Sequence, residues 1–205
     1  MWRNYIPGLL DYNSQIWSPV EISKVSSLEQ LLRSYTANTF GMEMYNYWDR
    51  LKFMGMMSIQ RRFQRYKIIY IWKVTMGKTH NFGLEWKTHP RWGKLISINY
   101  PKFYKVNSQV YKIWRQSLGV DGAMLYNNLP YEVRNYPGDS LTGFKMKLDR
   151  ILETIPDCPV SQGQYPLPIN HITGKNSNCL IDWCRYLKLN TRGMDTTDDD
   201  QSHLQ

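Results

Sequence analysis

Apolar side chains recur every three or four positions in several stretches, as in helices that bury one face. The clearest stretch is 58–77, where one face of a helix would carry Ile59, Phe63, Tyr66, Tyr70 and Val74. Ser58 suits the N-cap, and Gly77 suits the left-handed position beyond the last turn. After Lys67 the run is apolar on every side, so we expect this helix to begin at a wet, basic surface and to end buried. A strand at 66–74 is the alternative, but length and caps favour the helix.

Shorter helices are predicted on the N-terminal side. Apolar residues at helical spacing run from Tyr5 to Ile16, with Pro7 in the first turn and Pro19 after the end. A second helix is expected from Val20 or Ser27 to Phe40, with Gly41 as its stop, and a third at 46–53. The apolar pattern starts at Met1 without a polar lead-in, so we expect the chain to have been cut from a longer protein.

The pattern changes after Gly77. Short apolar alternations at 84–87 and 94–98 predict a small hairpin, and 109–116 predicts a helix. Pro130 is expected early in a short helix that follows a turn at 128–130. Ser140 should cap a further helix that Pro156 ends, with inward-facing Leu141, Phe144, Leu148, Ile151 and Ile155 and water-facing Lys145, Lys147, Asp149 and Glu153. We expect irregular structure at 157–178, a last short helix at 179–187, and disorder in the polar, acidic tail from Asn190.

The charge is unevenly distributed. The chain of 205 residues has a formal net charge of +9, and its 42% hydrophobic and 14% aromatic content is typical of a globular protein. Residues 50–115 contain fifteen Lys or Arg and one acid, Glu85. A basic segment of this kind favours a polyanionic partner, most simply RNA or DNA, and the alternative is a solvated cationic surface that keeps the protein soluble.

Cations alternate with aromatic residues in two segments of this basic region. The predicted nucleic-acid-binding residues are Arg61, Arg62, Arg65, Lys67, Lys73, Lys102, Lys105, Lys112 and Arg115. Cations hold phosphates, and exposed aromatic faces can stack bases. The alternative is that the aromatic residues are core and only the cations meet solvent. At 58–76 we favour this alternative, whereas at 100–115 both interpretations stay open.

No catalytic or metal site is predicted. The sequence contains no P-loop, GxGxxG, GxSxG or HExxH motif, and no close aspartate pair of the kind that two-metal nucleotidyl transfer needs. Three cysteines cannot form a disulfide framework and favour a reducing compartment, the nucleus or cytoplasm. His171, Cys179 and Cys184 lack a fourth zinc ligand nearby, so we expect no cofactor. There is no secretory signal and no apolar run long enough to span a membrane.

Several segments together resemble the C-terminal region of LINE-type (non-LTR) retrotransposon reverse transcriptases. They lie in the right order over about 6–182: PGLLDYNSQIWSP (7–19), YWDRL (47–51) with SIQRRFQRY (58–66), GAMLYNNLPYEVRN (122–135), FKMKLDR (144–150) with IPD (155–157), and NSNCLID (176–182). The endonuclease, fingers and palm of the family would lie upstream of Met1. The catalytic aspartates would lie there too, so no catalytic residue is carried over.

The resemblance implies a thumb and the helices downstream of it, a region that helps to hold template and primer. We therefore expect a mainly α fold, with a helical thumb-like segment at 1–78, a region of hairpin and short helices at 79–187, and a disordered tail at 188–205. The expected function is that of a non-catalytic fragment of an RNA-directed DNA polymerase that holds nucleic acid. The alternative is a decayed open reading frame, or a helical protein-interaction module without retained activity.

Overall fold

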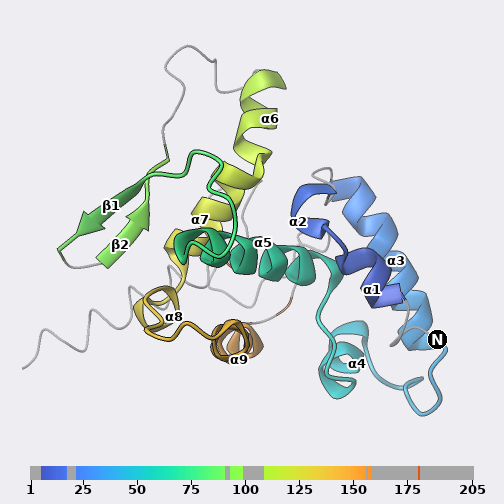
Figure 1. Cartoon of the computed structure of the whole chain (residues 1–205). Helices are drawn as coiled ribbons and strands as arrows, with labels where there is room; N and C mark the ends of the chain where they lie inside the picture. Colours follow the sequence, from blue (N-terminus) through green and yellow to red (C-terminus); the bar gives the residue numbers. More distant parts are fainter. Residues whose placement is uncertain are drawn as a thin grey trace, which may run out of the picture.

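Helix α5 (Ile59–Thr75) lies at the centre of the molecule, and the other elements are arranged along it (Figure 1). The structure is a computed structural model and describes residues 6–17, 22–90, 93–98, 109–155, 157 and 180. The Ser58 hydroxyl accepts a hydrogen bond from the Arg61 backbone N–H at 3.1 Å, and Gly77 has a φ of 66°. The predicted helix and both of its end signals are confirmed, and the alternative strand is wrong.

Four helices lie at the N-terminal end of α5: α1 (Ile6–Asp11), α2 (Ser14–Trp17), α3 (Ile22–Ala37) and α4 (Tyr47–Phe53). The single helix expected before Pro19 is divided in two, because Asn13 adopts a φ of 49° that a continuing helix excludes. Helix α3 ends at Ala37, three residues before the predicted end at Phe40, so Gly41, with a φ of 81°, lies in the following turn and is not the stop of the helix. The Asn46 side chain caps α4 by accepting two backbone N–H groups.

The predicted hairpin is present at the other end of α5. Strand β1 (Trp86–His89) pairs antiparallel with β2 (Gly93–Ile96), and Trp86 lies opposite Ile96. The outer edge of β2 meets the Asn127 amide, which accepts from the Ile96 N–H at 2.9 Å and donates to its carbonyl at 2.8 Å. This pairing attaches the hairpin to the helical part, so an otherwise marginal two-stranded sheet is held in place.

The remaining elements are α6 (Gln109–Gln116), the π-helical turn η1 (Leu118–Gly122), α7 (Ala123–Asn128), α8 (Tyr131–Arg134) and α9 (Leu141–Thr154). Helices α6, α8 and α9 were predicted, and η1 and α7 were not. Glycines at 119 and 122 argue against helix locally. Tertiary packing selects it, since a Cβ added to Gly122 would lie 2.9 Å from Ile71 of α5.

Two apolar cores share α5. The smaller core lies at its N-terminal end and contains Leu32, Tyr47, Leu51, Ile59 and Phe63. The larger core joins the C-terminal half of α5 to the hairpin, α7, α8 and α9, and in it Trp72 stacks on Phe144 with ring centroids 4.5 Å apart. This core therefore contains residues from both sides of the boundary proposed at residue 78.

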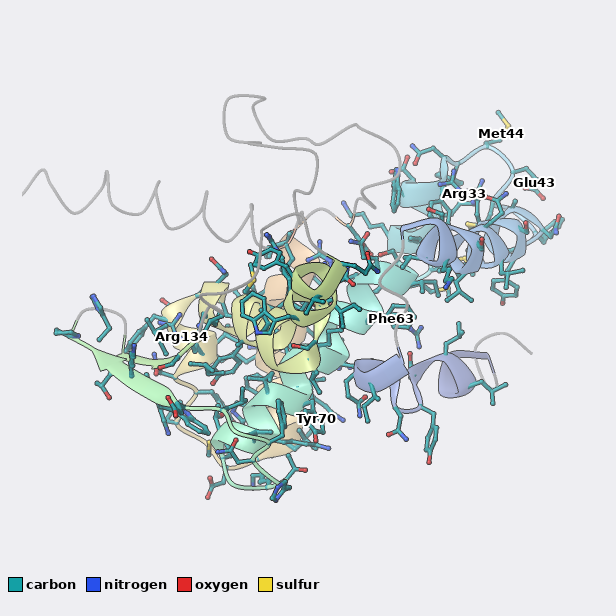
Figure 2. All side chains as sticks on the ribbon, turned by 90° about the horizontal axis from the view of Figure 1, so that it is seen from above. Arg33, Glu43, Met44, Phe63, Tyr70 and Arg134 are labelled. Carbon is teal, nitrogen blue, oxygen red and sulfur yellow. The ribbon has the colours of Figure 1, made fainter. Side chains whose placement is uncertain are left out.

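Figure 2 shows Phe63 and Tyr70 projecting from α5, and Met44 at the outer end of the α3–α4 part.

The mainly α fold class is confirmed. Among the described residues, none of the helices combines the length and the apolar character that crossing a bilayer requires. The inward positions predicted for α9 are buried or half-buried, but Asp149 does not simply face water, because it binds Arg65. Tyr5, Pro156, the irregular segment and short helix expected at 158–187, and the acidic tail lie outside the described residues, apart from the buried Leu180.

Candidate nucleic-acid interface

Four of the predicted binding cations, all in the first half of α5, are paired with acids from distant parts of the chain. Arg62 binds Asp11 at the end of α1, with an Nε–Oδ1 distance of 3.0 Å. Arg65 binds Asp149 of α9 through two hydrogen bonds, and the longer one is 2.8 Å. Two further pairs complete the set, Lys67 with Asp121 at 2.8 Å and Arg61 with Asp157 at 3.6 Å.

These pairs correct the expectation of a wet, basic surface on α5. The Arg61 side chain is only 3% exposed, and those of Arg62, Arg65 and Lys67 are 18%, 15% and 13% exposed. The physical reason is that acids from before and after the basic middle of the sequence pack against the first half of α5 and neutralise its cations. A helical wheel of α5 places the arginines opposite Phe63, but it does not show that other elements cover that side.

The start of α5 is held by two further carboxylate contacts. Asp157 accepts hydrogen bonds from the Ser58 N–H and hydroxyl, both at 2.6 Å. Glu29 of α3 is 3% exposed and accepts from the Ile59 N–H at 2.9 Å and from the Tyr47 hydroxyl. Helix N-termini attract negative charge because their first N–H groups lack intrahelical partners. These carboxylates therefore have a structural role in docking α3, and the chain that follows α9, onto α5.

Burial and pairing shift several pKa values at these contacts. Burial raises the pKa of Glu29 above its ordinary value, against the lowering effect of its hydrogen bonds. The hydrogen bond to Asp149 is the main cause that raises the pKa of Arg65, which stays cationic. Burial and the bond to Asp11 raise the pKa of Tyr66, so its hydroxyl stays protonated at neutral pH and donates at 2.9 Å. The first half of α5 is thus a charged interface whose cations are paired with acids inside the protein.

Arg134 is a second buried cation, and it lies on α8 (Figure 2). Its Nη1 donates to the carbonyls of Asn127 and Leu129 at 2.9 and 3.1 Å. These carbonyls lie at the C-terminal end of α7, where the last carbonyl groups of a helix have no backbone N–H donor within the helix. Burial lowers the pKa of Arg134. We therefore assign it to the closing of α7 and not to a binding surface.

The other predicted cations have different positions. Lys73 is half-buried in the last turn of α5, and Arg115 is exposed on α6. Lys112 belongs to α6, but its side chain lies outside the described residues, as do Lys102 and Lys105. The structure therefore brings together only part of the predicted set.

Exposed cations remain on the elements around the C-terminal end of α5, with Lys87 and Lys94 on opposite faces of the hairpin. We call these four positions together the hairpin-end surface: Lys78, Lys87, Lys94 and Arg115. None of the four forms an ion pair with another residue that the structure describes. Between Lys73 and Ser117 the described residues include one acid, Glu85. The first three were not among the predicted binding residues, although the charge count over 50–115 included them.

The hairpin-end surface also carries aromatic rings. The Lys94 ammonium lies 5.0 Å from the Trp86 ring centroid, and Tyr111 and Trp114 of α6 have centroids 5.4 Å apart. Phe82 is 40% exposed and lies 6.0 Å from Tyr70 by ring centroids. A Cβ added to Gly119 would be 3.3 Å from the Phe82 ring, so the loop before β1 packs on η1, next to α6. Cations and half-exposed aromatic faces therefore occur together at this end of the molecule.

The described residues contain no group of three or more His, Cys, Asp or Glu side chains that could hold a metal ion. Comparisons of the chain with models of known protein families, with curated proteins and with solved structures give no significant match. The similarity to non-LTR reverse transcriptases thus stays a prediction from the sequence motifs.

Proposed function

We propose that this protein is a nucleic-acid-holding module, similar to the region downstream of the polymerase core in non-LTR retrotransposon reverse transcriptases. The observation that carries the proposal is the hairpin-end surface, whose four exposed cations lack acidic partners among the described residues. Phosphate groups bind such cations with release of counterions, largely without regard to base sequence. The motif order over 6–182 supports the same function. The proposal assigns no catalytic residue.

Single-stranded RNA or DNA is the partner that suits this surface, in a reducing intracellular compartment. Half-exposed Trp86 and Trp114 offer faces for base stacking, and neighbouring lysines offer phosphate contacts. If Lys73 and the four surface cations each neutralise a phosphate, the log–log slope of affinity against salt should be about −3 to −4 on a single strand.

A salt-titrated binding assay with a fluorescent single-stranded RNA tests the proposal. The variant Lys78→Gln with Lys87→Gln removes two cations of the hairpin-end surface, and we expect the slope to become smaller by about 1.4. The matched control is Lys24→Gln with Lys52→Gln, which removes the same charge from exposed positions near the other end of α5. The control should keep the wild-type slope. Equal loss in both variants would show general attraction by the net charge, and no binding at low salt would favour the alternative of an inactive or protein-binding module.

A further inference from the structure

An open groove of about 420 Å³ lies between α8 and α9. Helix α9 contributes one face to it, Gly143, Met146, Lys147, Arg150 and Ile151. These positions repeat at three and four residues, so they follow one side of the helix for about 12 Å. The opposite wall comes from Glu132, Val133 and Tyr136. The core face of α9, with Phe144 and Leu148, lies elsewhere on the helix.

The groove depends on a glycine. A Cβ added to Gly143 would lie 2.1 Å from the Tyr136 hydroxyl oxygen, and one added to Gly138 would lie 2.6 Å from the same atom. Only residues without a side chain allow Tyr136 to lie this close to the first turn of α9. The tyrosine ring also contacts Phe144 of the core, with centroids 6.3 Å apart. The wall that faces Met146 and Ile151 is therefore anchored in the core.

The lining combines apolar surface with charges that have no ion-pair partner among the described residues. Met146 is 55% exposed, which is high for an apolar side chain on a helix that also contributes to the core. Lys147 and Arg150 lie one turn apart on one wall, and Glu132 lies on the other. None of the three forms an ion pair with another described residue. The nearest acid on α9, Asp149, is occupied by Arg65.

From this combination we propose that the groove is a docking site for an acidic amphipathic helix of a partner protein. The apolar stripe of that helix would cover Met146 and Ile151, and its acidic residues would meet Lys147 and Arg150. Methionine suits such a site because its unbranched side chain adapts to the surface that it contacts. The groove is open along its length, so it fits a helix laid along α9 better than a small molecule, which needs enclosure. This inference does not depend on the proposed nucleic-acid binding.

The test uses the full chain and a fluorescein-labelled helical peptide of about 15 residues, with a leucine stripe flanked by glutamates. A second peptide has lysine in place of each glutamate, and a third has serine in place of each leucine. We expect the acidic leucine peptide to bind about tenfold more tightly than either of the others. Equal binding of the serine peptide would overturn the proposal, because net charge alone would then explain the attraction.

The protein variant is Met146→Lys with Arg150→Glu, both at exposed positions. It should weaken binding of the acidic peptide about tenfold. The matched control, Met44→Lys with Lys52→Glu, makes the same change in net charge at exposed positions near α4 and should bind as the wild type does. Thermal unfolding verifies that both variants are folded, and Arg150→Gln alone replaces the double variant if that one unfolds.

Three results would contradict the proposal. In the first, the groove variant and the control variant bind the peptide equally. In the second, the groove variant loses RNA binding and keeps peptide binding, which would make the groove a nucleic-acid site. In the third, sedimentation would show a self-association that only the groove variant abolishes, which would make a second copy the occupant. Lys78→Gln with Lys87→Gln should leave peptide binding unchanged, so failure of the RNA proposal is separable from failure of this one.

Discussion

The guanidinium of Arg65 in α5 binds the carboxylate of Asp149 in α9 through two hydrogen bonds, across 84 positions of sequence. Both side chains are partly buried, so solvent screens the pair less than an exposed one. The contact joins two helices that otherwise meet through the apolar core, and it orients α9 on α5. It also removes Arg65 from the set of cations available to a ligand.

Loss of the Arg65–Asp149 pair should lower the stability of the folded protein and leave the binding of RNA unchanged. Arg65→Ala should lower the free energy of unfolding by about 1–2 kcal/mol, because Asp149 keeps a half-buried charge without its partner. Urea denaturation measures the change. Arg150→Ala, an exposed change on α9, is the control and should cost less than about 0.5 kcal/mol. The salt slope for RNA should stay at the wild-type value in Arg65→Ala, and a smaller slope would show that Arg65 contacts phosphate.

Phe63 should be a major stabilising residue of the smaller core. It is 4% exposed and packs with Leu32, Tyr47, Leu51 and Ile59. Phe63→Ala should lower the free energy of unfolding by about 3–5 kcal/mol, because it removes buried area and leaves a cavity. Phe53→Ala, at a 69% exposed position of α4, is the matched control, with an expected loss of about 1 kcal/mol or less. Similar thermal denaturation of the two variants would contradict the burial of Phe63.

Gly122 should tolerate no side chain at the contact of η1 with α5. Its added Cβ would lie 2.9 and 3.1 Å from two carbons of Ile71, which is fully buried in the larger core. Gly122→Ala should therefore destabilise the protein by about 1–3 kcal/mol through overpacking, although alanine favours helix. Gly8→Ala in α1 meets no atom within 4 Å and should be neutral or slightly stabilising. A stable Gly122→Ala would show that η1 lies farther from α5.

Glu29 should give the protein a component of stability that weakens as pH rises. Its pKa in the folded protein is raised above the ordinary value of 4.5, mainly by burial, so the folded state binds the proton more tightly than the unfolded state does. The stabilisation is complete below the unfolded-state pKa and is lost as pH rises through the folded-state pKa. Glu29→Gln removes this dependence and keeps a side chain of similar size.

The measurement is urea denaturation of wild type and Glu29→Gln from about pH 4 to pH 8. The stability of the variant minus that of the wild type should become more positive with rising pH over the window above 4.5. Glu153→Gln, which removes a carboxylate from an exposed position on α9, is the matched control for the change in charge. A difference that falls with pH for Glu29→Gln would mean that the charged carboxylate is stabilised in the folded state.

Local patterns in the sequence determined most of the secondary structure. Ser58 and Gly77 mark the ends of α5, Ser140 caps α9, and the alternations around 84–98 predict the hairpin, because caps, turns and periodicity act within a few residues. Helices η1 and α7 were missed for the same reason. The glycines of η1, directly before α7, are unfavourable locally, and the close packing of Gly122 on Ile71 is a long-range contact.

The sequence by itself also determined that residues 50–115 are strongly basic, but only the tertiary structure decided which of these cations are exposed. Arg62 meets Asp11 across 51 positions and Lys67 meets Asp121 across 54, and no local pattern specifies such partners. The candidate binding surface moved from the start of α5 to the hairpin end, because acids from before and after the basic segment pair with the cations at the start of α5 and leave those at the hairpin end exposed. Charge composition is a property of the chain, whereas the availability of each charge depends on what folds against it.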